Sequence, residues 1–262
     1  MGMLELFGTI FLCAVMLRIL RGGLVSNNGL TIVGMDVEGL SMGALAFILS
    51  TVYFGPLYGI AIVLAVMIHE FGHVAAFRIA GHDDARFRLI PLMGGVAISD
   101  KRPDNQLSDF FITLMGPGIS LAPLVAAMVM QQAVAPYWPE AADFLWTFAI
   151  VTGALNFFNL LPFWPLDGGR CVRIIADTFL PQLTKYIALA MSAGFAAAAL
   201  SLQSIILFAF ALIGAQTLFF EEPDEVRLDR MTPLQGLLAL GAYLFTLAAH
   251  LWGGFAMLVW MI

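Results

Sequence analysis

The strongest constraint on this fold is a series of long apolar runs that hold almost no charge. A helix needs roughly 20 apolar residues to cross the hydrocarbon core of a bilayer. The residues are 61% hydrophobic and 11% charged, and a soluble fold cannot hide that much apolar surface. We therefore predict an all-α integral membrane protein, a polytopic bundle of about six to eight transmembrane segments. About eight candidate segments fit this length, namely Leu4–Leu20, Leu40–Phe54, Leu57–Ile79, Phe110–Val134, Phe144–Leu161, Tyr186–Leu200, Ser204–Phe220 and Leu234–Met261.

The polar gaps between the runs are too short for a separate soluble domain. We therefore predict one integral membrane domain over residues 1–262. Glu5 stands where a signal peptide would carry a basic residue, so we expect the first segment to be a retained anchor. Cys13 and Cys171 are too few and too far apart for a disulfide framework, and we expect free thiols.

The basic residues predict the orientation, because cytoplasmic loops carry the lysines and arginines. If the N-terminus starts outside, all 12 basic residues fall on the inner side. The expected outer loops, Gly55–Pro56, Ala135–Asp143 and the turn near Gln203, contain none. The net charge is -6, and nothing in the sequence indicates nucleic-acid binding.

The sequence HEFGH lies in the middle of the third run, from His69 to His73. Gly55 and Pro56 favour a helix start just before this run, and Gly81 favours its end. His69 lies 12 residues inside the outer end of the run, which is about 18 Å at the rise of a helix. The ionisable cluster is therefore expected deep in the membrane, displaced slightly toward the cytoplasmic side.

Residues four apart share a helix face, so His69 and His73 can direct two imidazole nitrogens at one metal ion, with Glu70 beside it. A catalytic zinc takes three protein ligands and a water whose pKa falls toward ~7, and Glu70 would accept the water proton. The alternative is two buried histidines that bond to each other or to a backbone carbonyl. Ionisable groups in the bilayer cost at least ~2.5 kcal/mol each for Asp, Lys and Arg, which favours the metal.

Two histidines leave such a site one ligand short, and Asp167 is the best candidate for the third. It lies in NFFNLLPFWPLDGGR, residues 156–170, where prolines and glycines predict a broken helix. Lipid cannot satisfy irregular backbone, so this stretch must be covered by protein or line a wet cavity. The residues alone leave two alternatives open. Asp167 is equally plausible as an N-cap, and Asn159 as a helix-end cap or interhelical hydrogen bond instead of an oxyanion contact.

Together, HEFGH and NLLPFWPLDGG resemble the site-2 protease family, the intramembrane zinc metalloproteases. The two motifs stand in the family's order, about 90 residues apart. The resemblance implies that His69, His73 and Asp167 bind Zn²⁺ and that Glu70 is the catalytic base. It also implies that Asn159 contacts the substrate or its oxyanion.

The resemblance covers roughly residues 57–173, the expected catalytic core. Within it, LIPLMGGVAI resembles the family's re-entrant hairpin and implies that Gly94 and Gly95 lie on an edge that receives an unwound substrate strand. MGPGIS resembles the family's Gly-Pro element, which lets the next helix pack closely against the zinc helix; Ser120 replaces the usual asparagine. We expect a short form without a PDZ or CBS domain, regulated by its own membrane helices or by a membrane partner.

We therefore expect a zinc metalloendopeptidase that hydrolyses peptide bonds within or near the transmembrane segment of membrane proteins or hydrophobic peptides. We expect it in the cell membrane of a prokaryote, with its site toward the cytoplasm. One alternative is a metal-ion transporter or sensor that uses the same ligands, and another is an inactive scaffold that keeps zinc as a structural pin.

Two segments lie outside the core. Residues 27–40 favour a short sheet edge or a loop, and the acidic run 221–229 favours a docking loop or a solvated turn.

Overall fold

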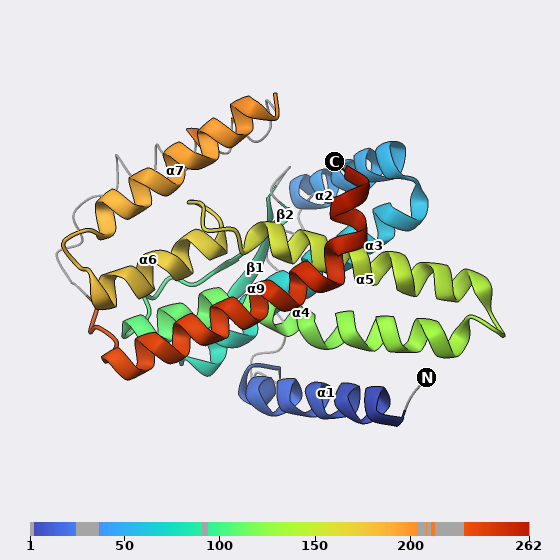
Figure 1. Cartoon of the computed structure of the whole chain (residues 1–262), viewed down its shortest axis with the longest axis horizontal. Coiled ribbons are helices and arrows are strands. Elements are labelled where there is room, and N and C mark those ends of the chain that lie inside the picture. The colour runs from blue at the N-terminus through green and yellow to red at the C-terminus, as the bar shows by residue number, and fades with distance from the viewer. Residues whose placement is uncertain are drawn as a thin grey trace. The chain divides into compact units, whose positions relative to one another are not determined.

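The computed structural model describes residues 3–24, 37–90, 94–203, 208, 211–212 and 228–261. Helices dominate these ranges, and two short strands form a single antiparallel pair (Figure 1). The predicted all-α membrane fold is confirmed. In chain order the elements are α1 (Met3–Leu24), α2 (Val37–Phe54), α3 (Pro56–Ile79), β1 (Arg86–Ile90), β2 (Gly94–Ile98), α4 (Gln106–Val134), α5 (Pro139–Asn159), α6 (Asp167–Phe179), α7 (Thr184–Ser201) and α9 (Pro233–Met261).

The chain is an integral membrane protein. Five helices in the described ranges are long and apolar enough to cross a bilayer, namely Glu5–Gly23, Pro56–Ile79, Gln106–Val134, Pro139–Asn159 and Pro233–Val259. Two further predicted segments form α2 and α7. The predicted segment Ser204–Phe220 lies almost entirely outside the described residues, as do most of the 27–40 stretch and most of the acidic run 221–229.

The contacts between residues divide the chain into two compact units. The first comprises Met1–Arg102, Met115–Phe157 and Ala248–Ile262, and the second comprises Pro103–Leu114 and Phe158–Leu247. Each unit has its own buried apolar cluster. The single domain expected from the sequence stays a prediction.

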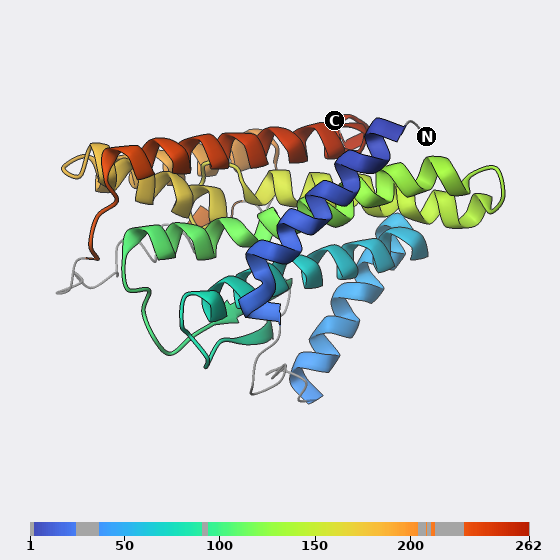
Figure 2. The ribbon, with the colours of Figure 1, turned by 90° about the horizontal axis from the view of Figure 1, so that it is seen from below.

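In the first unit, α3 is the central helix. Gly55 adopts a positive φ of 92° between α2 and α3, which a glycine tolerates without strain, and Pro56 begins α3. Both α1 and α2 contact α3, and a Cβ on Gly23 of α1 would overlap the backbone of Ala75. The part of α4 in this unit runs antiparallel beside α5 (Figures 1 and 2). Small residues thus bring α1 close to the helix that carries HEFGH.

The start of α5 corrects one sequence-based boundary. The sequence predicts an outer loop over Ala135–Asp143 and a helix from Phe144, whereas α5 begins at Pro139. Proline at the first position and Glu140 in the first turn both suit a helix N-terminus. Hydropathy alone misplaces this end because the first helical turn carries polar residues.

Close packing of α5 and α9 gives a prediction about stability. A Cβ on Gly153 of α5 would overlap the backbone of Gly253 and Gly254 of α9, so the two helices touch through their backbones. We expect Gly153→Ala to lower the melting temperature in detergent by several degrees, since 1 kcal/mol corresponds to about 2–4 °C for a chain of this size. Gly241→Ala is the matched control, because its Cβ would meet nothing within 4 Å. Equal melting temperatures for the two variants would contradict this packing.

In the second unit, Asp177 of α6 ties several segments together. Its carboxylate accepts hydrogen bonds from Gln106 (2.6 Å), Arg230 (3.1 Å) and Thr184 (3.3 Å). The hydroxyl of Tyr243 in α9 donates to the carbonyl of Leu160 at 2.7 Å. These bonds fix the start of the break between α5 and α6 against α9 and hold α6 beside α7.

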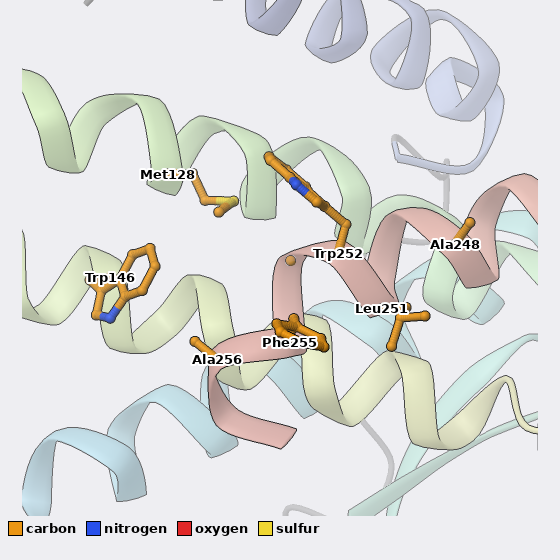
Figure 3. Close-up of a pocket in the computed structure, with 8 residues that line it drawn as sticks. Met128, Trp146, Ala248, Leu251, Trp252, Phe255 and Ala256 are labelled. Atoms are coloured by element: carbon orange, nitrogen blue, oxygen red, sulfur yellow. The ribbon is translucent and has the colours of Figure 1, made fainter. Parts of the chain in front are cut away.

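An apolar pocket of about 430 Å³ lies between α4, α5 and α9 in the first unit. Figure 3 shows Met128, Trp146 and Trp252 around the same opening, one from each helix. None of the described residues that line this pocket is ionisable. The described residues of its lining therefore offer no carboxylate, imidazole or thiolate for a metal ion or for acid–base chemistry.

Candidate metal centre

HEFGH lies on a helix, as the sequence predicts, in the C-terminal half of α3. Among its side chains, His69, Glu70 and His73 are buried, with 3%, 8% and 9% of their surface exposed. The Nε2 atoms of the two histidines lie 3.1 Å apart, and their rings meet at 79°. Two nitrogens bound tetrahedrally to zinc at about 2.0–2.1 Å lie about 3.3 Å from each other. The two imidazoles are thus placed to share one metal ion, with Glu70 adjacent in sequence.

Asn156, which no sequence motif indicated, holds the first of these histidines. Its Oδ1 lies 2.7 Å from Nδ1 of His69, and its Nδ2 donates to the carbonyl of Thr152 at 2.8 Å. Asn156 is fully buried on α5. The available signal was a second asparagine in an apolar run, three residues before Asn159. Only the packing of α5 against α3 shows that Asn156 faces His69.

The Gly-Pro element of α4 packs directly on this site, which confirms the close approach expected for MGPGIS. A Cβ on Gly116 would overlap the imidazole of His73, and a Cβ on Gly72 would overlap the carbonyl of Met115. The hydroxyl of Ser120 turns back to the carbonyl of Gly116 in its own helix, at 3.4 Å. Ser120 therefore bonds within α4 instead of offering its donor to the site.

His250 of α9 supports the same segment of α4. Its Nε2 lies 2.9 Å from the carbonyl oxygen of Pro117 and donates to it, because a carbonyl can only accept. The side chain is fully buried. This contact joins α9 to Pro117 of α4, the residue that follows Gly116.

The broken helix predicted within residues 156–170 is confirmed. α5 ends at Asn159 and α6 begins at Asp167, and the stretch between them includes a cis peptide bond at Trp164–Pro165. A Cβ on Gly168 would overlap the carbonyls of Leu160 and Leu161, so this turn requires glycine. The backbone therefore folds back tightly just before and after the predicted ligand.

Asn159 and Asp167 meet across this break. Nδ2 of Asn159 donates to Oδ2 of Asp167 at 2.8 Å. The N-cap alternative for Asp167 is not supported, since Leu166 occupies the cap position and the cap has no side-chain hydrogen bond. Asp167 lies in the second unit and the two histidines in the first. That they bind one ion together, and that Asn159 contacts a substrate oxyanion, stay predictions.

The predicted hairpin forms beside α3. β1 and β2 pair antiparallel, with Leu89 opposite Gly95 and Ile90 opposite Gly94. β2 contacts α3, and β1 contacts α2. The hairpin prediction is confirmed, while reception of a substrate strand at Gly94 and Gly95 stays a prediction.

A polar network closes the base of this hairpin. Nδ1 of the buried His82 lies 2.8 Å from the hydroxyl of Ser99, which donates to Asp84 at 3.0 Å. The amide of Asp100 also donates to Asp84. Burial raises the pKa of Asp84, but these hydrogen bonds outweigh it, and the net direction is downward. Asp84 is thus held as a carboxylate that fixes the hairpin to the end of α3.

Comparisons with known proteins confirm the resemblance read from the motifs. The model of peptidase family M50 matches residues 127–201, which include Asn159 and Asp167. A zinc metalloprotease of Methanocaldococcus jannaschii is 30% identical over 116 residues, 44% of this chain and 33% of that protein. Stage IV sporulation protein FB of Bacillus subtilis is 29% identical over 122 residues, 47% of this chain and 41% of that protein. The match thus spans well under half the length of either relative.

Among solved structures, the chain is similar to a site-2 protease from Methanocaldococcus jannaschii. Its likeness has a TM-score of 0.46 and 23% sequence identity, and it covers 73% of this chain and 90% of that one.

Both cysteines of the chain are free, as expected from the sequence.

Proposed function

We propose that this chain is an intramembrane zinc metalloprotease that hydrolyses peptide bonds within or near the transmembrane segments of membrane proteins. The observation that carries the proposal is the pair of buried imidazole nitrogens, 3.1 Å apart on a membrane helix next to Glu70. The donor set fits zinc, which accepts imidazole nitrogen and carboxylate oxygen. The zinc metalloproteases among the similar proteins support the same assignment.

In this proposal His69, His73 and Asp167 hold the ion. Three protein ligands leave one coordination position for water, which is the pattern of a catalytic zinc and not of a closed structural site. When bound, zinc would lower the pKa of water to about 7 and polarise a substrate carbonyl. Asn159 holds the carboxylate of Asp167 through its amide nitrogen, so we assign Asn159 a positioning role as well as the predicted substrate contact.

Glu70 is the proposed general base. Its carboxylate would accept a proton from the attacking water and return it to the leaving amine, and burial keeps bulk water away from this exchange. A substrate helix must unwind locally, because an intact helix hydrogen-bonds its own carbonyls. The extended backbone at Gly94 and Gly95 is the proposed place for the unwound strand.

The proposed orientation places this site toward the cytoplasm of a prokaryotic cell. It rests on the 12 basic residues, all of which fall on one side of the membrane in the expected topology. The proposed partners are a membrane-protein or hydrophobic-peptide substrate and a regulatory membrane protein.

Removal and return of the metal test the function. We expect purified protein in detergent to cleave members of a panel of labelled transmembrane peptides, to lose this activity after chelation, and to regain it with Zn²⁺. The same preparation in sealed vesicles would be assayed for zinc flux. Flux without cleavage would replace the proposal with a transporter, and tightly bound zinc with neither cleavage nor flux would favour a scaffold.

A further inference from the structure

Asn156 makes two hydrogen bonds, and together they indicate which ring nitrogen of His69 carries the proton. Its amide stands between the carbonyl of Thr152, 2.8 Å from Nδ2, and the imidazole of His69, 2.7 Å from Oδ1. We infer that Asn156 is a positioning residue that keeps the proton of His69 on Nδ1 and so directs the lone pair of Nε2 to the metal. The identity of that metal rests on the proposed function.

The orientation of the amide follows from the carbonyl that it meets. A backbone carbonyl can only accept hydrogen bonds, so the amide atom that faces Thr152 must be the NH₂ group. The atom that faces His69 is then the oxygen, which can only accept. The hydrogen on this side must come from the imidazole, and Nδ1 of His69 therefore carries the proton.

This tautomer suits the geometry on the other side of the ring. With the proton on Nδ1, a neutral His69 has its lone pair on Nε2, the atom that lies 3.1 Å from Nε2 of His73. With the opposite tautomer, the Nε2 proton would point into the space where the two imidazoles meet. Histidine ligands of metals commonly donate their second N–H to such a partner, which fixes both the tautomer and the ring plane.

The position of Asn156 is itself fixed by packing. Its side chain is fully buried and bonds to its own helix, so its amide has no solvent to turn toward. Three residues earlier, Gly153 touches the backbone of α9. The acceptor for His69 is therefore built into a rigid part of α5.

Three variants measured for zinc affinity test this role. We expect Asn156→Leu, which keeps the volume but removes the acceptor, to weaken zinc binding by about 10–100-fold in a chelator competition, the usual effect of losing such a partner. Asn156→Asp keeps an acceptor for Nδ1 and should stay within about tenfold of wild type. The control is Thr147→Val, which removes another buried polar group of α5 and should leave zinc affinity unchanged.

The tautomer can be measured without any metal or substrate. The chain has only four histidines. The ¹⁵N resonances of metal-free protein in detergent can therefore be assigned from variants that each replace one histidine. We expect Nδ1–H on His69 in wild type and loss of this preference in Asn156→Leu. An Nε2–H tautomer in wild type, or unchanged zinc affinity in a folded Asn156→Leu, would overturn the inference. Failure of wild type to bind zinc would instead contradict the proposed function, and the tautomer would still decide the role of Asn156.

Discussion

Replacement of Glu70 by glutamine is expected to lower the rate of peptide-bond cleavage by roughly 10²–10⁴-fold, the usual contribution of a positioned general base. Glutamine preserves the size of the side chain and removes only its ability to take a proton at neutral pH. Glu70 is buried and adjacent to His69 in sequence, but it is not one of the proposed ligands. Zinc should therefore remain bound while the chemical step fails.

The informative measurement is cleavage of the same labelled transmembrane peptides by wild type and Glu70→Gln at equal zinc content. Met67→Leu is a suitable control on α3, because Met67 is 49% exposed whereas Glu70 is buried. Cleavage by Glu70→Gln within tenfold of wild type would exclude Glu70 as the base. If Glu70→Gln instead transported zinc as well as wild type did, the result would favour an ion pathway, which needs no proton acceptor at this position.

Helix ends could be predicted where the sequence carries local signals. The run Leu57–Ile79 became α3, Pro56–Ile79, because Gly55 and Pro56 define its start within a few residues. The broken helix before Asp167 was also predictable, since proline and glycine act on the backbone at their own positions. The start of α5 was predicted too late because hydropathy does not register a polar first turn.

Contacts between helices could not be predicted in the same way. Asn156 and Asn159 are equally polar in the sequence, yet one bonds to His69 and the other to Asp167. The difference depends on the rotation of α5, which side-chain packing sets and no local pattern records. The link between Ser99, His82 and Asp84 likewise joins residues up to 17 positions apart in sequence through the folding of the hairpin.

The Gly-Pro element could be predicted only in part. The motif predicted a close approach of α4 to the helix with HEFGH. The structure shows which side chain each glycine of the motif faces. Gly116 faces the imidazole of His73, whereas Gly118, two residues later, faces only the thioether of Met115. The two glycines thus have different roles, although both belong to the same short motif.

The contact between Gly116 and His73 gives a second prediction with a large effect on cleavage. We expect Gly116→Ala to lower kcat/KM for peptide cleavage by roughly 10²-fold or more, because a catalytic group displaced by about 1 Å costs that much. The new methyl group would overlap three atoms of the His73 ring. If α3 moved away from α4 to make room, it would lose the close packing of Gly72 against the backbone of α4 at Met115. We therefore expect the imidazole to rotate away from its position beside His69.

Gly118→Ala provides the matched control. Its Cβ would lie 3.3 Å from Sδ of Met115, which is the flexible part of that side chain. Alanine also favours a helix over glycine by about 0.5–1 kcal/mol, so this variant should be as stable as wild type or slightly more so. Both variants would be compared for helix content by circular dichroism, zinc affinity and cleavage. Equal zinc affinity and cleavage in the two would mean that the imidazole of His73 tolerates displacement, and the shared geometry of His69 and His73 would then not be what the site requires.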